Sequence, residues 1–317
     1  MDLDLNDTET SIVDSLRVLL RRQAGPARAK RLAAAAEPDL ALAHALAESG
    51  FLDLFGDERA GPSAAGLVTE EVSRAAGAVP IGARTLVASA VVNGIELPPL
   101  VTVAETGTTA PVRFAAAADG LLLVGGDEAT LLARGEWTAE PVPSRCGYPV
   151  ARVRVTGAGR GLGPGSAGVA RRWWQAALAA EIAGTAQAAV DLTTKYLKER
   201  EQFGRPLGAF QAIAHRLAEC AVQVEGVRWL AREAIALGAP AGLAAGAAVA
   251  AAGAARLVTQ ETHQLTGAMG FTLEYDLHVW SLRLQALRTE GGGIGRHAEA
   301  LVGARWQFTH AEGDGRR

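Results

Sequence analysis

Residues 196–211 read YLKEREQFGRPLGAFQ, and this stretch decides the fold. Arg200 stands where the sequence pattern predicts the end of a helix, three residues before Phe203 in the pair Phe203-Gly204. A guanidinium group binds phosphate oxygens through paired, charge-assisted hydrogen bonds. Phe203 adds an aromatic face, and Gln202 and Gln211 add amide donors and acceptors. The stretch is therefore suited to a ligand that carries both phosphate groups and a ring system.

A second stretch, residues 264–272, reads QLTGAMGFT. Its Gln264 offers another amide, and Gly267 and Gly270 allow the backbone to approach a ligand closely. Taken alone, Arg200 is a surface charge beside a core aromatic, and Gln264 is a polar residue on a helix. Neither stretch alone identifies a binding site, whereas two spaced motifs form a far more specific pattern.

The 317 residues divide into three regions that differ in composition and hydrophobic pattern. We expect a mainly α fold with a small β domain, divided as residues 1–95 (helical), 96–165 (β) and 166–317 (helical). Hydrophobic residues make up 49% of the chain but aromatic residues only 5%, so alanine, leucine and valine supply the core. Alanine is the strongest helix former, which favours helices. In the first region we predict helices capped at Asp7 or Thr8, over residues 39–48 and over residues 64–76.

The middle region shows short apolar runs that predict strands. They are Val112–Ala116, Leu121–Val124 and Val150–Val155. Asp119-Gly120 lies between the first two runs, and this dipeptide between apolar runs predicts a hairpin turn. Residues 157–165, rich in glycine, form the expected connection to the third region.

The third region has a helical period, clearest between residues 210 and 237. Long alanine-rich helices joined by short connections predict a domain similar to a four-helix bundle. The uncharged run from Ala234 to Ala255 contains Pro240 and consists mostly of alanine and glycine. It is too weakly hydrophobic to predict a membrane span, and we expect a tightly packed soluble helix.

Charge and cysteine content narrow the possible classes of protein. The formal net charge of −3 and the lack of a basic cluster argue against a nucleic-acid partner. Cys146 and Cys220 have no metal-ligand spacing and cannot form a disulfide framework, so we expect no metal site. The acidic start of the chain lacks the basic region of a signal peptide, which predicts a cytoplasmic protein.

The two stretches resemble the R-x-x-F-G … F-Q and Q-x-x-G-G-x-G-F motifs of the acyl-CoA dehydrogenase family, with Ala268 in place of one glycine. The resemblance implies an N-terminal helical domain, a middle β domain and a C-terminal four-helix bundle. It also implies an oxidoreductase that uses FAD, acts on an acyl-CoA, passes electrons to an electron-transfer acceptor and forms an oligomer, because these groups reach a neighbouring subunit's flavin. The FAD-binding residues carried over are Arg200, Gln202, Phe203, Gln211, Gln264, Gly267 and Ala268.

The chain departs from the family at the positions of the catalytic base. Such a dehydrogenase removes a proton from the CoA thioester with a carboxylate that faces the flavin. Counted from the second motif, one family position for this base falls on Gly291, and Glu290 lies one residue short of it. The other position falls on Trp174, and the nearest acid, Glu181, is about two helical turns away. Glu290 is therefore the candidate base if the chain has one.

The middle region is also shorter than in full members of the family, and it lacks the segment that covers the flavin ring. Retained flavin-contacting residues with absent bases resemble the truncated subunit of actinobacterial heterotetrameric (α2β2) acyl-CoA dehydrogenases of sterol side-chain degradation. This resemblance implies a non-catalytic subunit that completes the FAD site of a larger catalytic partner. Two alternatives stay open: a self-sufficient homo-oligomeric dehydrogenase with Glu290 as base, and a flavin-free structural or non-redox homologue.

Overall fold

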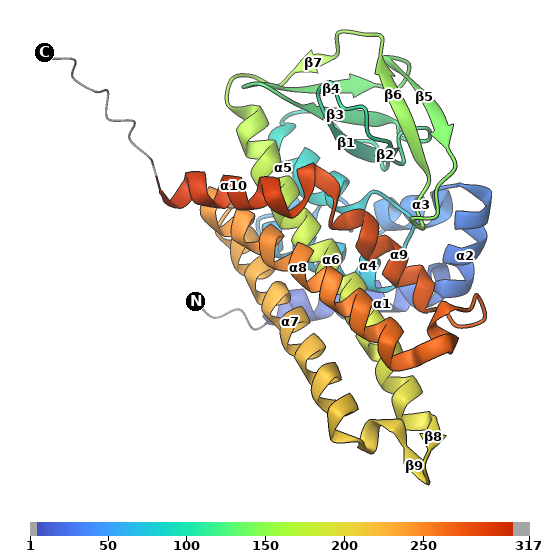
Figure 1. Ribbon diagram of the computed structural model, residues 1–317. Helices are drawn as coiled ribbons and strands as arrows, with labels where there is room; N and C mark the ends of the chain where they lie inside the picture. The colour runs from blue at the N-terminus through green and yellow to red at the C-terminus, as the bar shows by residue number, and fades with distance from the viewer. Residues whose placement is uncertain (1–4, 307–317) are drawn as a thin grey trace, which may run out of the picture.

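The computed structural model describes residues 5–306. Strands β1 to β7 gather at one end of the molecule, and helices form the rest (Figure 1). Two long helices, α6 and α7, extend away from the strands to a small hairpin at the opposite end. The predicted class, mainly α with a small β part between two helical parts, is confirmed.

The N-terminal part consists of short helices that pack on the long helix α6. They are α1 (Asp7–Gln23), α2 (Pro26–Ala35), α3 (Leu40–Glu48), α4 (Gly61–Arg74), the π-helical turn η2 (Ala83–Ala88) and α5 (Ser89–Val91), with a 3-10 turn η1 (Leu54–Gly56). The cap of α1 is Asn6 rather than Asp7 or Thr8. Asn6 Oδ1 accepts the Glu9 N–H at 2.9 Å, and the Glu9 carboxylate accepts the Asn6 N–H at 3.0 Å. This reciprocal capping box fixes the helix start one residue earlier than expected.

The middle part forms two small sheets. Their strands are β1 (Val101–Glu105), β2 (Val112–Arg113), β3 (Gly120–Val124), β4 (Ala129–Ala133), β5 (Trp137–Val142), β6 (Val150–Val155) and β7 (Arg160–Gly161). One sheet has the order β1-β3-β4-β7 and the other has the order β2-β6-β5. The hairpin predicted at Asp119-Gly120 is wrong, because β3 pairs in parallel with β1 and Gly120 lies opposite Val101. The antiparallel partner of β3 is β4, so the turn lies after Val124 instead.

The C-terminal part is a helical bundle. It contains α6 (Ser166–Glu199), α7 (Gln211–Ala236), α8 (Ala241–Thr266), α9 (Leu277–Leu287) and α10 (Gly293–Arg305), with the two-stranded hairpin β8 (Glu201–Gln202) and β9 (Arg205–Pro206) between α6 and α7. Three 3-10 turns, η3 (Leu207–Ala209), η4 (Gly267–Phe271) and η5 (Glu290–Gly292), connect these elements. Helix α8 packs against α6, α7 and α10, which gives the predicted bundle.

Small residues let the helices approach closely. A Cβ atom on Gly184 of α6 would stand 2.0 Å from the carbonyl oxygen of Glu70 in α4. Only glycine therefore permits this helix crossing. Buried alanines line α8 in the same way, among them Ala244, Ala248 and Ala251. A core built from small residues rather than aromatic ones thus allows the helices to lie close together.

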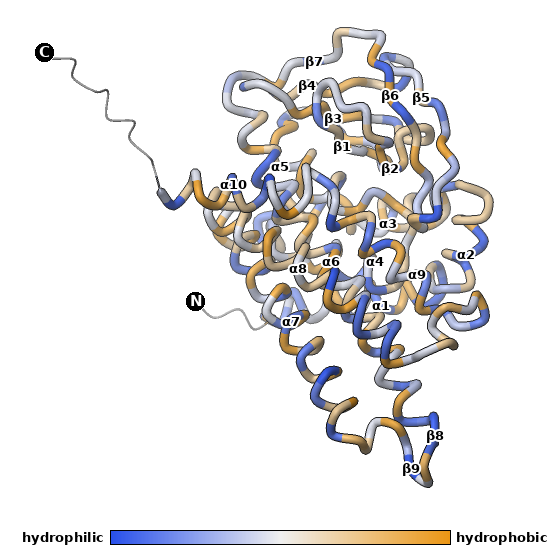
Figure 2. Tube along the Cα trace, viewed as in Figure 1, coloured by the Kyte–Doolittle hydropathy of each residue, from blue (hydrophilic) through white to orange (hydrophobic). Residues whose placement is uncertain are grey.

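Helix α8 and the turn after it, Ala241–Phe271, are long and apolar enough to cross a membrane by length and composition alone. Half of its most apolar window is buried inside the structure, against neighbouring helices. Core helices of globular bundles pass the same test. Hydrophobic and hydrophilic positions alternate along the long helices that surround it (Figure 2). The packing therefore supports the expectation of a core helix.

Candidate functional site

The first sequence motif forms the protruding hairpin. Helix α6 ends at Glu199, and Arg200 is its C-cap residue in an extended conformation. Gln202 and Arg205 pair across the hairpin, and its turn consists of Phe203 (φ 55°) and Gly204 (φ 78°). Two successive positive φ angles fit a type I′ turn, for which phenylalanine is an unfavourable residue. Phe203 lies at the tip of the hairpin, and 91% of the residue is exposed.

Aromatic contacts hold the hairpin against the start of α7. The Arg205 guanidinium lies 4.0 Å from the centroid of the Phe210 ring, and Phe203 meets this ring edge-on at 6.1 Å. Arg200 and Gln211 are exposed, and within residues 5–306 their side chains form no hydrogen bond or ion pair. Gln202 bonds only to the carbonyl of Glu201, at 2.8 Å. The polar groups of this motif are therefore available to a ligand or a partner.

The second motif lies at the C-terminal end of α8. The helix ends at Thr266, and Gly267 has φ 58°, which favours glycine. Gln264, Gly267 and Ala268 are exposed. Ala268 is absent from the residues with positive φ, so alanine replaces the family's glycine there without backbone strain. Gly270 is buried, and a Cβ atom on it would stand 2.1 Å from Thr266 Oγ1.

The fold brings the two motifs to one end of the bundle. Helix α7 returns along α6, and α8 returns along α7, so α6 and α8 run in the same direction, and α6 continues past the end of α8 to the hairpin (Figure 1). The Tyr196 and Tyr275 rings lie 5.5 Å apart, and the Tyr275 hydroxyl donates to the Leu192 carbonyl at 2.9 Å. These contacts join the end of α6 to the segment after η4. The seven predicted FAD-contacting residues thus share one exposed end of the molecule.

Glu290 lies elsewhere, in a cavity between the strands and the bundle. The cavity has a volume of about 280 Å³ and is lined by residues from β1, β2, α6 and η5. Trp174 of α6 forms part of its wall, as does Glu290. Glu290 begins a turn in which Gly291, Gly292 and Gly293 all have positive φ. The two family positions for a base, at Trp174 and at the Glu290-Gly291 turn, therefore face the same space.

Arg113 of β2 closes this space by pairing with two carboxylates. Its Nη2 donates to Glu181 at 2.8 Å and to Glu290 at 3.0 Å, and its Nε also bonds to Glu290. Glu181 accepts a further hydrogen bond from the Gly82 N–H at 3.1 Å. The side chains of Arg113, Glu181 and Glu290 are 11%, 3% and 20% exposed. A buried guanidinium therefore holds both acids that lie nearest to the family's two base positions.

Burial and charge act in opposite directions on these groups. Burial raises the pKa of Glu290, and the Arg113 guanidinium opposes this rise. Burial alone would lower the pKa of Arg113, but Glu181 and Glu290 hold it well above its usual range. Arg113 consequently stays charged at neutral pH. A base for proton abstraction from carbon needs a free lone pair near the substrate, and Glu290 offers its oxygens to Arg113 instead.

Sequence reasoning did not find Arg113. An arginine inside an apolar strand run was the available signal, because buried arginines are almost always paired. Glu181 drew attention only as the acid nearest to Trp174. That Arg113 joins Glu181 to Glu290 depends on the packing of β2 against α6 and η5, and no local pattern encodes it.

The chain is similar to known proteins in both sequence and structure. The model of the acyl-CoA dehydrogenase C-terminal domain matches residues 172–302. The acyl-CoA dehydrogenase IpdE2 of Mycolicibacterium smegmatis is 32% identical over 229 residues, which cover 69% of this chain and 71% of that protein. The chain belongs to the acyl-CoA dehydrogenase family. IpdE2 of Mycobacterium tuberculosis is 40% identical over 106 residues, or 33% of each chain.

Solved structures of the family share the fold over nearly the whole chain. A chain of the ChsE4-ChsE5 complex from Mycobacterium tuberculosis superposes with a TM-score of 0.81 and 20% identity, covering 94% of this chain and 97% of that one. The Tcur3481-Tcur3483 steroid ACAD G363A variant gives a TM-score of 0.83 and 24% identity, with the same coverage. The predicted acyl-CoA dehydrogenase fold, the oxidoreductase class and the FAD cofactor of this family are thereby confirmed.

The two sites differ in how well they suit FAD. The exposed end carries an uncommitted arginine and two uncommitted amides, which suit a pyrophosphate and its attached groups. The cavity at Glu290 is smaller than the roughly 300–1,000 Å³ of ordinary ligand pockets, and the Arg113 ion pairs lie in its wall. When bound, FAD supplies the hydride acceptor of the family's reaction. In this chain the groups that fit the cofactor lie at the exposed end.

Proposed function

We propose that this chain is a non-catalytic subunit of a heteromeric, FAD-dependent acyl-CoA dehydrogenase that introduces an α,β double bond into a CoA thioester. The observation that carries the proposal is Arg113, whose ion pairs occupy both Glu181 and Glu290. A chain whose own acids are held in this way supplies no base. The catalytic base then belongs to a larger partner chain of the same family.

The role left to this chain is to complete the partner's FAD site. Arg200, Gln202, Phe203 and Gln211 are presented on and beside the hairpin, and Gln264, Gly267 and Ala268 on the end of α8 and η4. Exposed aromatic and apolar side chains accompany them, with Phe203 at 91% and Phe271 at 76% exposure. Apolar side chains that are exposed beside uncommitted polar groups suit a surface that a partner covers.

The relatives indicate the partner and the substrate class. One structural neighbour is a complex of two named chains, and another is described as a steroid ACAD. By analogy with these proteins, we assign an α2β2 assembly and a steroid-derived acyl-CoA substrate to this chain. An electron-transfer acceptor would reoxidise the flavin, and we place the assembly in the cytoplasm.

The test is co-expression of this chain with a larger acyl-CoA dehydrogenase chain from the same organism, followed by measurement of mass and flavin content. We expect one FAD for each pair of unlike chains and activity only in the complex. Glu290→Gln should leave the turnover of the complex within about twofold of the unaltered value, since a positioning change costs far less than the loss of a base, which is worth about 10²–10⁴-fold. If the purified chain alone binds one FAD per chain and oxidises an acyl-CoA, the proposal is wrong.

A second candidate, a self-sufficient dehydrogenase with Glu290 as base, rests on the three-glycine turn after that residue. Gly291, Gly292 and Gly293 permit backbone conformations that could carry the carboxylate away from Arg113. Under this alternative, Glu290→Gln lowers turnover by about 10²-fold or more. The flavin-free homologue is separated from both by colour: a purified complex that is yellow and bleaches with substrate excludes it.

A further inference from the structure

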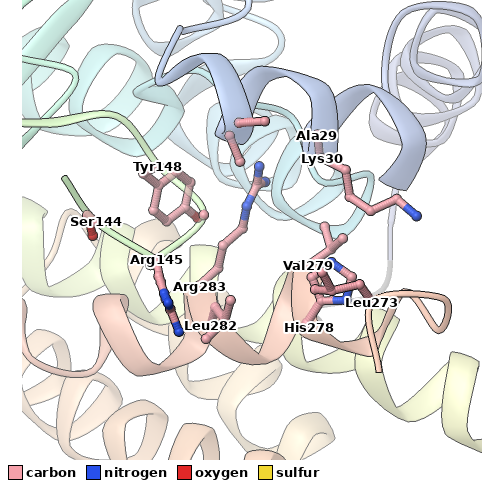
Figure 3. A pocket seen from close by; sticks show the side chains of 13 residues that line it. Ala29, Lys30, Ser144, Arg145, Tyr148, Leu273, His278, Val279, Leu282 and Arg283 are labelled. Atoms are coloured by element: carbon pink, nitrogen blue, oxygen red, sulfur yellow. The ribbon is translucent and has the colours of Figure 1, made fainter. Parts of the chain in front are cut away.

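A further cavity lies away from both candidate flavin sites. Its volume is about 660 Å³, and it is bounded by α2, by the loop between β5 and β6, and by α9. Figure 3 shows Arg283 reaching from α9 toward α2, beside the ring of Tyr148. A cavity of this size falls within the roughly 300–1,000 Å³ range of small-molecule sites.

Arg283 is a buried cation without a counter-charge. Its residue is 1% exposed, and its one hydrogen bond runs from Nη1 to the Gly77 carbonyl at 3.0 Å. Within residues 5–306, its Nε and Nη2 have no hydrogen-bond partner. No carboxylate of this part of the chain forms an ion pair with it. Buried guanidinium groups are normally paired, so this arrangement calls for an anion.

The surroundings of Arg283 supply no negative charge. The Tyr148 ring stacks 4.6 Å from its guanidinium, but burial raises the pKa of Tyr148 to about 12, so the hydroxyl is neutral. On the same ring lies Arg113, at 4.9 Å, and the nearby carboxylates of Glu181 and Glu290 are committed to Arg113. Burial accordingly lowers the pKa of Arg283.

The cavity wall carries further positive groups and no acidic residue. Arg145 lines it and forms no hydrogen bond or ion pair through its side chain within the described chain. Lys30 also lines it, but its Nζ is compensated by Asp276 at 2.6 Å. Gly147 has φ 76°, and a Cβ atom on it would stand 3.1 Å from Cγ of Arg283. A glycine there lets the loop pack directly on the arginine stem.

Apart from Ser144 and His278, the rest of the wall is apolar. Ala29 and Ala33 of α2 face Val279 and Leu282 of α9 across the cavity. An unpaired guanidinium beside apolar side chains of α2 and α9 matches a ligand with one anionic headgroup and an apolar body. Hydrogen bonds to such a headgroup from a buried guanidinium are strong, because both partners are charged.

We propose that this cavity binds a small organic anion, with its carboxylate or phosphate paired to Arg283 and its apolar body between α2 and α9. Arg145 at the mouth adds attraction for the same charge. The site lies outside the residues proposed to contact FAD and outside the Glu290 cavity. The proposal therefore stands independently of the non-catalytic role proposed above.

The test uses the full chain in its purified oligomer and isothermal titration calorimetry. The probes are octanoate, 1-octanol as its uncharged counterpart, and inorganic phosphate. We expect octanoate to bind about tenfold or more tightly than 1-octanol, because only octanoate pairs with the guanidinium. Inorganic phosphate that competes with octanoate assigns the headgroup subsite to phosphate, and phosphate that does not compete assigns it to carboxylate.

Variants locate the binding at Arg283. Arg283→Met should reduce octanoate affinity to the level of 1-octanol and leave 1-octanol affinity unchanged. Arg283→Lys, which keeps the charge but loses the planar fork, should give an intermediate affinity and serves if the methionine variant fails to fold. Arg154→Ala, at an exposed arginine on β6, is the matched control and should bind octanoate as the unaltered chain does.

Three results would overturn the proposal. The first is equal affinity for octanoate and 1-octanol, or no saturable binding of either. The second is octanoate binding that persists unchanged in Arg283→Met. The third is a complex with the partner chain that excludes octanoate and is weakened by Arg283→Met, because the cavity then holds a carboxylate of the partner.

Discussion

Arg113 is the residue on which the interior between the strands and the bundle depends. It is nearly buried, and it carries the charge that compensates Glu181 and Glu290. A buried ion pair adds little net stability compared with a well-packed apolar replacement, but removal of one partner leaves the others uncompensated. Among these three residues, loss of the single cation, Arg113, should therefore reduce the stability of the fold most.

Arg113→Met should destabilise the fold by about 3–5 kcal/mol, because it leaves two buried carboxylates without a counter-charge. The loss should be smaller at pH 5 than at pH 8. Without Arg113, the main influence that opposes the rise that burial causes in the folded-state pKa of Glu290 is removed, so stability is retained at low pH and lost as pH rises. Chemical denaturation of the full chain at both pH values measures this difference.

The matched control is Arg134→Met, which removes an arginine that is 61% exposed and lies 3.4 Å from Asp119. Solvent-exposed ion pairs contribute about 0–1 kcal/mol to stability, so the free energy of unfolding of this variant should lie close to that of the unaltered protein. Equal losses in the two variants would contradict the assignment of Arg113 as the central charge.

Ionisation of Glu290 should make the stability of the protein depend on pH. Burial raises its folded-state pKa above the ordinary value of 4.5. Its contribution to stability is therefore complete below that value and is lost as pH rises through the raised folded-state pKa. Relative to the unaltered chain, Glu290→Gln should become progressively more stable as pH rises across this window. A constant difference between the two proteins from pH 4 to pH 7 would show that the pKa is not raised.

At the scale of secondary-structure elements, close helix approach is the main device of this fold. Helix α6 meets α4 at Gly184, where the Glu70 carbonyl leaves no room for a side chain. Ion pairs reinforce this contact, with Arg228 of α7 bonding to Glu70 at 2.7 Å. The bundle and the N-terminal helices are thus joined by a direct backbone contact between α6 and α4. A methyl group at position 184 would push these two helices apart.

Gly184→Ala should therefore destabilise the protein by about 1–3 kcal/mol or more, since the helices must move apart to admit the Cβ atom. Gly253→Ala in α8 is the matched control, because a Cβ atom there meets nothing within 4 Å. Replacing a helical glycine with alanine at such a position should stabilise by about 0.5–1 kcal/mol. Thermal unfolding of both variants by circular dichroism measures the opposite shifts.

The hairpin between α6 and α7 offers a test that separates stability from cofactor binding. Phe203 has φ 55°, a conformation that costs a residue such as phenylalanine about 1–2 kcal/mol. Asparagine tolerates this conformation, so Phe203→Asn should keep or raise the melting temperature. If Phe203 contacts flavin, the purified complex should nevertheless contain less FAD. Unchanged FAD content would remove Phe203 from the cofactor site.

Elements with strong periodicity were predictable from the sequence, and contacts between distant elements were not. The expected helix over residues 210–237 is α7, Gln211–Ala236, because its apolar period is set locally. The strand Val150–Val155 was also predicted to the residue. The Asp119-Gly120 hairpin failed because β3 pairs with β1, and such parallel pairing depends on where the chain returns. Arg113 and Arg283 were missed for the same reason, since their environments come from three separate elements each.

At the scale of the whole molecule, the exposed groups and the buried acids are separated. The hairpin and η4 lie at one end of the bundle, and the Glu290 cavity lies beside the strands near the other (Figure 1). In the proposed assembly, each end meets a different part of the partner. A chain arranged in this way can supply cofactor contacts to a neighbour while its own cavity stays closed.

Arg200→Ala should test whether this chain's hairpin binds FAD in the complex. We expect FAD affinity to fall about 10–100-fold, because hydrogen bonds to a charged group contribute about 1.5–3 kcal/mol. Arg200 is exposed and has no side-chain hydrogen bond within residues 5–306, so the melting temperature of the isolated chain should not change. Arg200→Lys keeps the charge but loses the fork and should be intermediate. Arg154→Ala, an exposed arginine on β6, is the control and should leave FAD bound. Flavin fluorescence on dilution of the complex measures the affinity. A complex that retains FAD equally in all three variants would place the cofactor away from this chain's hairpin.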